Sequence, residues 1–384
     1  MVSPGRDPAK RTIPSFVTRS TDVFIAGEGP YYHYRIPGLV VTAGGRLLAY
    51  CEARCGRGDW EPSDIVMRAS DDGGQTWGPV TALAAHADYG PSCMNNPLMI
   101  PDRVTGAVHL LYCHDYRQAY YRRSDDGGAS FGSPMEITPT FAAFQGAVPW
   151  TVLAIGPGHG IQLRSGRLIG PIWLSADPAR RHEPNRAGVI YSDDHGDTWQ
   201  AGALVPDTIP SCNETEAVQL SDGRVLLNMR NLGGAWRRAV TDSAAGIGPW
   251  TDPVYDQSLF EPRCFGSLLA GQMPDGRPAL FFANPDSRDR PSATEQSSAP
   301  RTDLTLRMSY DGGRTWPVRR LIDSCSSGYA DLAMAPDGGL LCLYERGPVS
   351  RAEGGIASLT LARLDLSTLV STAADGPATA PGLH

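Results

Sequence analysis

Ser70-Asp71-Asp72-Gly73-Gly74-Gln75-Thr76-Trp77 is the stretch that decides the fold, because its pattern returns along the chain. The pattern Ser-x-Asp-x-Gly-x-Thr-Trp occurs four times, and the later copies begin at Ser124, Ser192 and Ser309. Asp and Gly allow a tight bend, and the Ser, Asp and Thr side chains satisfy backbone groups within it. The aromatic residue can pack beneath the bend. We therefore interpret each copy as a hairpin turn with a structural role.

A second repeat surrounds these turns and consists of an apolar strand, a Gly-containing turn and another apolar strand. The starts of its copies are about 50 to 65 residues apart, the length of a four-stranded propeller blade with generous loops. No long amphipathic helical stretch competes with this interpretation. The sequence predicts an all-β fold, a six-bladed β-propeller with four antiparallel strands per blade. The six hairpins are Gly38–Arg54, Pro97–His114, Gly160–Leu174, Glu216–Arg230, Gly266–Asn284 and Tyr329–Glu345.

No linker divides the chain, so residues 21–365 are predicted to form a single six-bladed propeller that carries the functional site. Residues 1–20 and 366–384 are small, polar and Pro-containing. Such composition favours an N-terminal arm and a flexible C-terminal tail.

Composition excludes several classes of partner. The 384 residues carry a formal net charge of −7, and no basic stripe is present to contact nucleic acid. No apolar run is long enough to insert into a membrane. The eight cysteines lack CxxC pairs and the histidines lack zinc-ligand spacing, so no metal site is predicted. The first twenty residues contain no apolar secretory segment, which indicates the cytoplasm at face value, or secretion if a leading segment has been removed. Neither oligomeric state nor location is fixed by these observations.

Potentially functional side chains gather at the ends of the hairpins. In a propeller, the start of one such strand and the end of its hairpin partner lie at the same rim. Residues far apart in the sequence are therefore expected to meet over the centre of the ring. These residues are Arg35, Arg54, Asp59, Glu214, Arg230, Tyr329 and Glu345.

The same residues carry a resemblance to a known family. Tyr34-Arg35-Ile36-Pro37 resembles the Arg-Ile-Pro motif of bacterial and animal sialidases (neuraminidases), and the eight-residue turns resemble their Asp boxes, the BNR repeats. Further matches are Asn213-Glu214 before Arg230, the segment from Arg301 to Arg307, and Ser327-Gly328-Tyr329 before Leu343-Tyr344-Glu345. The resemblance spans residues 30 to 360. It implies a retaining exo-sialidase that removes terminal sialic acid from glycans, glycoproteins or glycolipids.

The resemblance implies that three arginines clamp the substrate carboxylate. Arg35, Arg230 and Arg301 stand at the matching positions, and a guanidinium forms bidentate, charge-assisted hydrogen bonds with a carboxylate. Arg307 is the competitor for the third place, although it lies deeper in a strand pattern. Glu345 resembles the carboxylate that holds the first arginine in position.

The nucleophile implied by the resemblance is Tyr329, with Glu214 as its base. Sialidases are an exception among glycosidases in using a Tyr nucleophile. A carboxylate nucleophile would be repelled by the substrate's own carboxylate, whereas a phenol is neutral until a base removes its proton. Glu216, two residues further along, is the alternative base.

Asp59 is predicted to be the general acid and base, because a loop containing Gly56 and Gly58 can deliver it to the leaving oxygen. Glu61 and Asp64 are its local rivals. Arg54 is expected to orient the substrate or this loop. The predicted sequence is protonation by Asp59, attack by Tyr329, then hydrolysis with net retention. No cofactor is implied.

The identity of the sugar and the class of function are not decided by these motifs. The substrate could be another ulosonic acid, such as deaminated neuraminic acid, because Trp60, Met94, Asn95 and Asn96 are only candidates for an N-acetyl pocket. The sequence also leaves open a trans-sialidase, a non-catalytic sialic-acid-binding propeller and a metal-dependent hydrolase. For the metal-dependent hydrolase, the sequence pattern lacks a ligand cluster.

Overall fold

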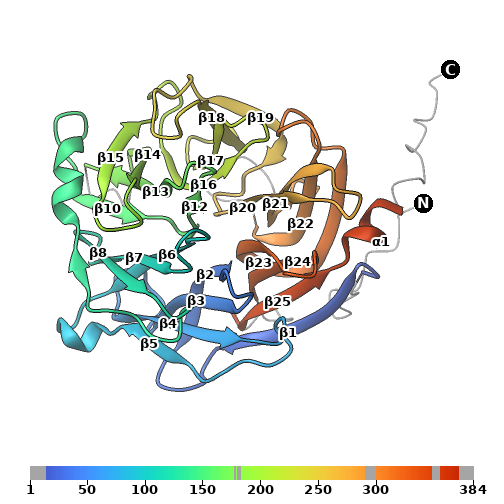
Figure 1. Ribbon diagram of the computed structural model, residues 1–384, viewed down its shortest axis with the longest axis horizontal. Coiled ribbons are helices and arrows are strands. Elements are labelled where there is room, and N and C mark those ends of the chain that lie inside the picture. Colours follow the sequence, from blue (N-terminus) through green and yellow to red (C-terminus); the bar gives the residue numbers. More distant parts are fainter. Residues whose placement is uncertain (1–13, 177–178, 180–182, 290–299, 348–354, 372–384) are drawn as a thin grey trace.

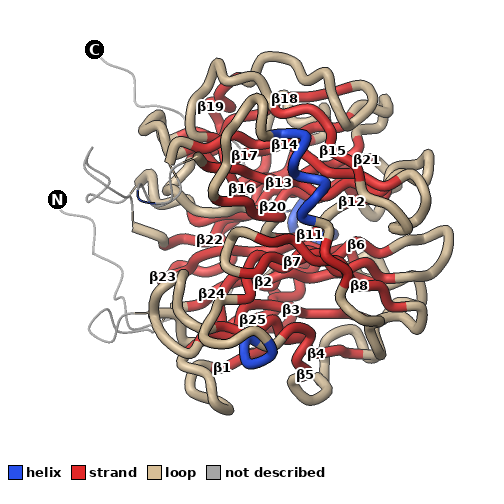
Figure 2. The backbone as a smooth tube through the Cα atoms, turned by 90° about the vertical axis from the view of Figure 1, so that its left-hand side faces the viewer, coloured by secondary structure: helices blue, strands red, loops and turns tan. Residues whose placement is uncertain are grey.

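Alternation of apolar segments with Gly-containing turns gives a chain built almost entirely of β-strands. The computed structural model describes residues 14–176, 179, 183–289, 300–347 and 355–371. Within them, the strands form five hydrogen-bonded sheets arranged around a central axis (Figure 1). Figure 2 shows the same arrangement from the side, with strands filling the interior and loops around them.

Two of the sheets have four strands each, joined in chain order. The first contains β2 (His33–Val41), β3 (Leu47–Arg54), β4 (Ser63–Ser70) and β5 (Thr81–Ala84). The other contains β16 (Cys212–Gln219), β17 (Val225–Asn231), β18 (Arg237–Ser243) and β19 (Val254–Phe260).

Two further sheets have five strands. One has the order β11 (Gly158–His159), β6 (Met94–Pro101), β7 (Val108–His114), β8 (Gln118–Ser124) and β9 (Met135–Glu136). The other comprises β10 (Val152–Ile155), β13 (Leu168–Ser175), β14 (Asn185–Ser192), β15 (Gln200–Leu204) and β12 (Ile161–Gln162), which also pairs with β13. Two 3₁₀ helices, η1 (His86–Asp88) and η2 (Thr138–Phe144), lie in connections.

The fifth sheet has seven strands. Their order is β1 (Val17–Ile25), β25 (Ser358–Leu364), β24 (Leu340–Arg346), β23 (Val318–Met334), β22 (Thr302–Ser309), β21 (Pro278–Pro285) and β20 (Ser267–Gln272). Because β1 pairs with β25, strands from near the two ends of the chain close the ring.

The propeller-like, all-β architecture agrees with the sequence prediction, but the count of six separate four-stranded blades was wrong. The cause is β23, which runs for 17 residues without a break. Its first part pairs with β22 and its last part with β24, so two strand groups that the sequence pattern separates share one strand. The short strand β11 adds a parallel pairing with β6 that no hairpin pattern predicted.

The predicted arm and tail boundaries also need correction. Residues 17–20 belong to β1, and residues 366–371 form the helix α1 (Leu366–Ser371), whose Leu366 and Leu369 are buried. Backbone pairing with β25 holds the first segment on the fold, and buried leucines hold the second. The rest of the predicted arm and tail, residues 1–13 and 372–384, lies outside the described residues. Among the described segments, no helix has the length and apolar character needed to cross a membrane.

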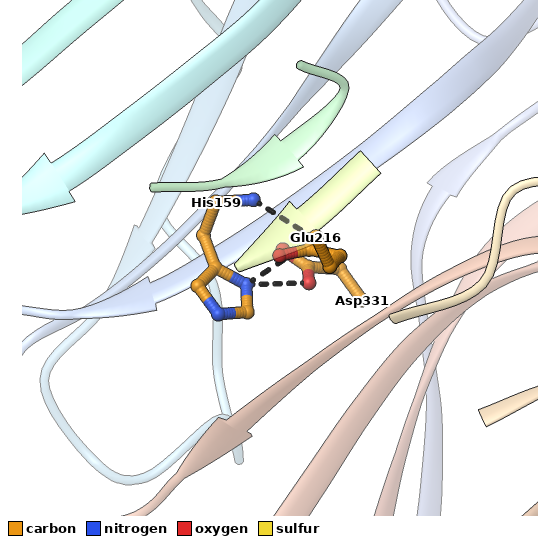
Figure 3. A group of neighbouring side chains, drawn as sticks. All are labelled: His159, Glu216 and Asp331. Carbon is orange, nitrogen blue, oxygen red and sulfur yellow. Dashed lines mark hydrogen bonds and ion pairs between the residues drawn. The ribbon is translucent and has the colours of Figure 1, made fainter. Parts of the chain in front are cut away.

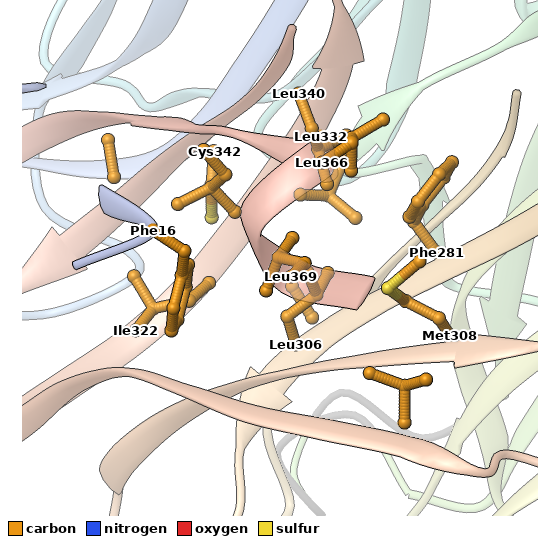
Figure 4. Close-up of a cluster of buried hydrophobic side chains, with 14 of the residues drawn as sticks. Phe16, Phe281, Leu306, Met308, Ile322, Leu332, Leu340, Cys342, Leu366 and Leu369 are labelled. Carbon is orange, nitrogen blue, oxygen red and sulfur yellow. The ribbon is translucent and has the colours of Figure 1, made fainter. Parts of the chain in front are cut away.

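The hydrophobic core lies between strands and between neighbouring sheets, so both faces of most strands are covered. All eight residues of β3 and of β13 are buried. One core cluster joins Phe281, Leu306, Leu332 and Cys342 of the seven-stranded sheet to Leu366 and Leu369 of α1 (Figure 4). Burial on both faces explains why the strands appear as continuous apolar runs rather than alternating patterns.

The four turn boxes are hairpin turns, as predicted. They connect β4 with β5, β8 with β9, β14 with β15 and β22 with β23. In the first box, Ser70 Oγ donates to Asp72 Oδ1 (2.8 Å) and Thr76 Oγ1 donates to Asp72 Oδ2 (2.6 Å). The other three boxes repeat these two bonds. The boxes therefore stabilise the turns between strands, and the functional site is formed by other residues.

Candidate active site

A pocket of about 560 Å³ lies where the inner strands of the sheets meet. It contains every residue predicted to act on the substrate directly, together with Arg54. Its lining residues are Arg35, Ile36, Arg54, Gly58, Asp59, Trp60, Asn96, Tyr116, Trp173, Asn213, Glu214, Arg230, Leu232, Arg301 and Tyr329. The pocket is rich in arginine although the chain as a whole is acidic. Positive charge is therefore concentrated locally, as an anionic ligand requires.

Tyr329 and Glu214 form a hydrogen-bonded pair on the pocket floor. Tyr329, on β23, donates from Oη to Oε1 of Glu214, on β16, over 2.5 Å. Arg230, on β17, donates from Nη1 to Glu214 Oε2 and to Tyr329 Oη, each over 2.6 Å. Both Tyr329 and Glu214 are buried. A phenol bonded to a carboxylate can lose its proton to that carboxylate when it attacks an electrophile.

The electrostatic surroundings keep this phenol neutral at rest. Burial raises the pKa of Tyr329 well above its usual range; Arg230 acts against this shift and Glu214 adds to it. Burial opposes the charge of Arg230, but Glu214 and Tyr329 raise the pKa of its guanidinium. Arg230 therefore remains a cation that can stabilise negative charge developing on the Tyr329 oxygen.

Three guanidinium groups surround the Tyr329 ring. The Cζ atoms of Arg35, Arg230 and Arg301 lie 5.9, 6.0 and 5.4 Å from its centroid. Arg35 comes from β2 and Arg230 from β17, and Arg301 immediately precedes β22. Arg301 Nη2 donates to the carbonyl oxygen of Arg263 (2.6 Å), which fixes the direction of its side chain.

Glu345, on β24, accepts hydrogen bonds from Arg35 and from the backbone near the pocket. Its Oε1 accepts from Arg35 Nε (2.5 Å) and from the amide of Ile36 (3.0 Å), and its Oε2 accepts from the amide of Tyr329 (3.0 Å). Burial would raise its pKa, but Arg35 and the Ile36 amide outweigh burial and lower the pKa of Glu345. A buried carboxylate thus joins Arg35 to the backbone of Tyr329.

The strands that reach the pocket are irregular where they meet it. The pairing register shifts between Arg35 and Gly38 in β2, between Cys212 and Thr215 in β16, and between Ser327 and Ala330 in β23. Ile36 has φ 59°, which is unusual for a β-branched residue. Such bulges redirect side chains near functional sites. Here they turn Arg35, Glu214 and Tyr329 toward one point.

Asp59 stands at the pocket opening on the loop after β3. Its side chain is 55 % exposed, and its Oδ1 accepts from Arg54 Nη1 over 2.5 Å. Arg54 is buried and also donates to Glu52 Oε2 from Nε (2.8 Å) and Nη2 (2.6 Å). Arg54 therefore holds the Asp59 loop in place, one of the two roles expected for it.

The rival candidates lie elsewhere. Asp64 accepts from Tyr31 Oη (2.5 Å) and from the His86 amide (2.7 Å), outside the pocket lining. Arg307 donates to Asp286 (2.7 Å), which agrees with a structural role. Glu216 faces His159. Neither Glu61 nor Met94 nor Asn95 lines the pocket, whereas Trp60 and Asn96 do.

The sequence analysis missed Tyr116, Trp173, Asn213 and Leu232. Trp60 contacts Tyr116 (ring centroids 4.8 Å apart), and Tyr116 contacts Trp173 (6.0 Å), which gives the pocket an aromatic wall. Trp60 lies in the connection between β3 and β4, Tyr116 lies in that between β7 and β8, and Trp173 belongs to β13. Strands β7, β8 and β13 lie across the ring from β22 and β23 (Figure 1). The residues follow the rule used for the others, since Tyr116 and Trp173 lie at the ends of predicted hairpins.

Comparisons with known proteins show the family to which the chain is similar. The BNR repeat-like domain family matches residues 45–342. A sialidase of Micromonospora viridifaciens is 33% identical over an alignment of 355 residues, which covers 85% of this chain and 52% of that protein. Sialidase-3 of Mus musculus is 27% identical, covering 89% of this chain and 94% of that protein. A Hadza microbial sialidase superposes with a TM-score of 0.78 at 29% identity, covering 91% of this chain and 69% of that one. This chain thus spans about half the length of the bacterial relative.

Proposed function

The chain belongs to the BNR repeat-like domain family, among relatives that are sialidases, and from this premise we propose that it is a retaining exo-sialidase. The observation that carries the proposal is the 2.5 Å hydrogen bond from Tyr329 to Glu214 beneath three arginines. A neutral nucleophile with a built-in base suits an anomeric carbon that bears a carboxylate, because an anionic nucleophile would be repelled by that carboxylate.

Binding begins with the substrate carboxylate. Arg35, Arg230 and Arg301 provide charge-assisted donors on one side of the pocket. Arg230 shares its Nη1 with Glu214 and Tyr329, so the cation that binds the carboxylate also contacts the reacting pair. The clamp thereby places the anomeric carbon against Tyr329 Oη.

In the first chemical step Asp59 donates its proton to the glycosidic oxygen while Tyr329 Oη attacks the anomeric carbon. The bond from that carbon to the leaving oxygen breaks, and the phenol proton passes to Glu214. The products are the free alcohol of the aglycone and a glycosyl-tyrosine. Exposure of Asp59 at the pocket opening suits contact with an aglycone that extends outward.

In the second step Asp59, now a carboxylate, accepts a proton from water, and the water oxygen attacks the anomeric carbon. The bond to Tyr329 Oη breaks and Glu214 returns the proton to the phenolate. Two successive inversions give net retention.

The aromatic wall favours an N-acetylated sugar over a deaminated one. Trp60, Tyr116 and Trp173 line the same pocket as Arg301, and we assign the sugar carbons remote from the carboxylate to this wall. An acetamido methyl group gains from apolar contact, whereas a hydroxyl group at the same position does not. We therefore place N-acetylneuraminic acid first among substrates and deaminated neuraminic acid second.

The test is release of fluorophore from 4-methylumbelliferyl N-acetylneuraminate by the wild type and by Tyr329→Phe. Turnover that falls by roughly 10³-fold or more in the variant supports the proposed nucleophile. Near-normal turnover by the variant would remove Tyr329 from the mechanism. A wild type active only on the deaminated analogue would overturn the order of substrates. Binding without turnover of either glycoside would point to a non-catalytic sialic-acid-binding propeller.

A further inference from the structure

Directly beneath the Tyr329–Glu214 pair lies a second group of buried ionisable residues. His159 on β11, Glu216 on β16 and Asp331 on β23 converge on one another (Figure 3). His159 Nδ1 is 2.8 Å from Asp331 Oδ1 and 3.7 Å from Glu216 Oε1. The His159 amide donates to Glu216 Oε1 over 3.3 Å. The proposed reaction uses none of these three side chains.

The group sits on the same two strands as the reacting pair. Glu214 and Glu216 are two residues apart on β16, and Tyr329 and Asp331 are two residues apart on β23. His159 therefore bridges β16 and β23 two residues further along each strand than the hydrogen bond that joins Tyr329 to Glu214. Phe265, whose ring centroid is 5.6 Å from that of Tyr329, shares a buried apolar cluster with Tyr329 and Ile36.

Asp331 is anchored from several sides. Besides His159, it accepts from the amide of Leu39 on β2 (2.7 Å), from Ser267 Oγ on β20 (2.9 Å) and from the amide of Leu332 (3.0 Å). Three of these hydrogen bonds fall on Oδ1 and one on Oδ2, and together they fix the orientation of the carboxylate. Asp331 is thus held in place, and His159 connects it to Glu216 of β16.

The space around the bridge is full. A Cβ atom on Gly158 would lie 2.0 Å from Glu216 Oε1 and 2.6 Å from Phe265 Cζ. Tyr50 Oη donates to the Gly158 carbonyl (2.7 Å) and accepts from the Met99 amide (2.9 Å), which holds β11 from the other side. A movement of His159 is therefore transmitted to β16 and β23 rather than absorbed by a void.

Charge strengthens the bridge. Burial works against a charged imidazole, but Glu216 and Asp331 outweigh it and raise the pKa of His159 to about 9. Burial raises the pKa of Glu216 well above its usual range, and His159 opposes that shift. At neutral pH the imidazolium faces Asp331 across a charge-assisted hydrogen bond.

We propose that His159 is a positioning residue that sets the separation of β16 and β23, and thereby the alignment of Glu214 with Tyr329. The inference rests on the proposed function, since it concerns the efficiency of that reaction. It assigns His159 no contact with the substrate. Its loss should therefore slow the chemical step and leave the arginine clamp intact.

The experiment compares His159→Asn with His109→Asn on 4-methylumbelliferyl N-acetylneuraminate. His109 is the matched control, because it is also buried and lies beside a carboxylate, Asp102 (3.6 Å), but it lies on β7 and does not line the pocket. We expect His159→Asn to lower kcat by about 10- to 100-fold, the scale of a small misplacement of reacting groups. KM and the inhibition constant of free N-acetylneuraminic acid should stay within about two-fold, because the clamp is unchanged. His109→Asn should lower Tm and leave kcat unchanged.

Three outcomes would overturn the inference. One is an unchanged kcat in a folded His159→Asn protein. Another is an equal loss of kcat in His109→Asn, which would show a general effect of stability. The third is a rise in KM at constant kcat. If His159→Asn does not fold, Glu216→Gln decides, because it weakens the same bridge from β16: a lower kcat at constant KM supports the inference, and wild-type kinetics overturn it. An inactive wild type would instead count against the proposed function.

Discussion

At the scale of single residues, Tyr329 is the point on which the pocket converges. Its hydroxyl meets Glu214 and Arg230, its ring lies among three guanidinium groups, and its amide donates to Glu345. Glu345 also holds Arg35. A single buried carboxylate therefore fixes the proposed nucleophile and one proposed carboxylate ligand relative to each other, although they lie on different strands.

The third arginine of the clamp can be identified by kinetics. Arg301→Ala should raise KM by about 10- to 100-fold, because it removes charge-assisted hydrogen bonds to the substrate carboxylate. Arg307→Ala is the control: its partner is Asp286, not the pocket, so KM should stay the same while Tm falls. Steady-state kinetics and thermal melts of both variants check this. The reverse pattern would transfer the role to Arg307.

At the scale of elements, the bulges decide where side chains point. In β2, β16 and β23 the pairing register slips where the strand reaches the pocket. The bulge in β23 contains Gly328, which packs against Glu345. A side chain at this position has no room, because a Cβ atom would lie 2.0 Å from Glu345 Oε2.

Gly328→Ala should therefore lower kcat/KM by about 10-fold or more, since displacing Glu345 shifts both Arg35 and the Tyr329 backbone. Gly146→Ala is the matched control, because a Cβ atom there meets nothing within 4 Å. Both proteins should fold, as circular dichroism would check. Equal kinetics of the two variants would show that the bulge tolerates a larger residue and that Glu345 does not limit the reaction.

The sequence alone predicted the elements better than their irregularities. Hairpins were predictable because apolar runs and Gly-containing turns are local features, and the ends of the hairpins located Arg35, Arg230 and Tyr329. Bulges depend on pairing between strands, so no local pattern indicated the left-handed Ile36 or the turn of Glu214 toward Tyr329. Glu216 illustrates the limit: its spacing made it a rival base, and the structure separates the two carboxylates because Glu214 bonds to Tyr329 whereas Glu216 faces His159.

At the scale of the whole molecule, a buried polar group joins five strands of the ring. Asp331, His159 and Glu216 link β23, β11 and β16 to β2 and β20 through the bonds that Asp331 accepts. The sequence did not indicate this group, because its members are separated by 57 and 115 residues. The predicted number of blades was wrong for a related reason. β23 is continuous because it pairs with both β22 and β24, and this pairing between strands is not visible in a local sequence pattern.

The group of His159, Glu216 and Asp331 predicts that the protein becomes less stable at alkaline pH. The pKa of His159 is raised from 6.5 to about 9, so its contribution to stability is complete below about pH 6.5 and is lost as pH rises through 9. The raised pKa of Glu216 acts in the same direction, and Asp331, Tyr50 and Arg238 are the other ionisable groups that influence the cluster. The Tm advantage of the wild type over His159→Asn should shrink between pH 7 and pH 10. A difference that stays constant over this range would contradict a charged imidazole.

The pairing of β1 with β25 has a consequence for the order in which the protein is made. A ribosome releases the N-terminal strand first, yet β1 has no partner until β25 has been synthesised. Glu214 and Arg230 emerge well before Tyr329 and Glu345, which complete the pocket. A nascent or truncated chain therefore carries the proposed base without its nucleophile. Under the proposed mechanism, no catalysis is possible until Tyr329 and Glu345 have been synthesised.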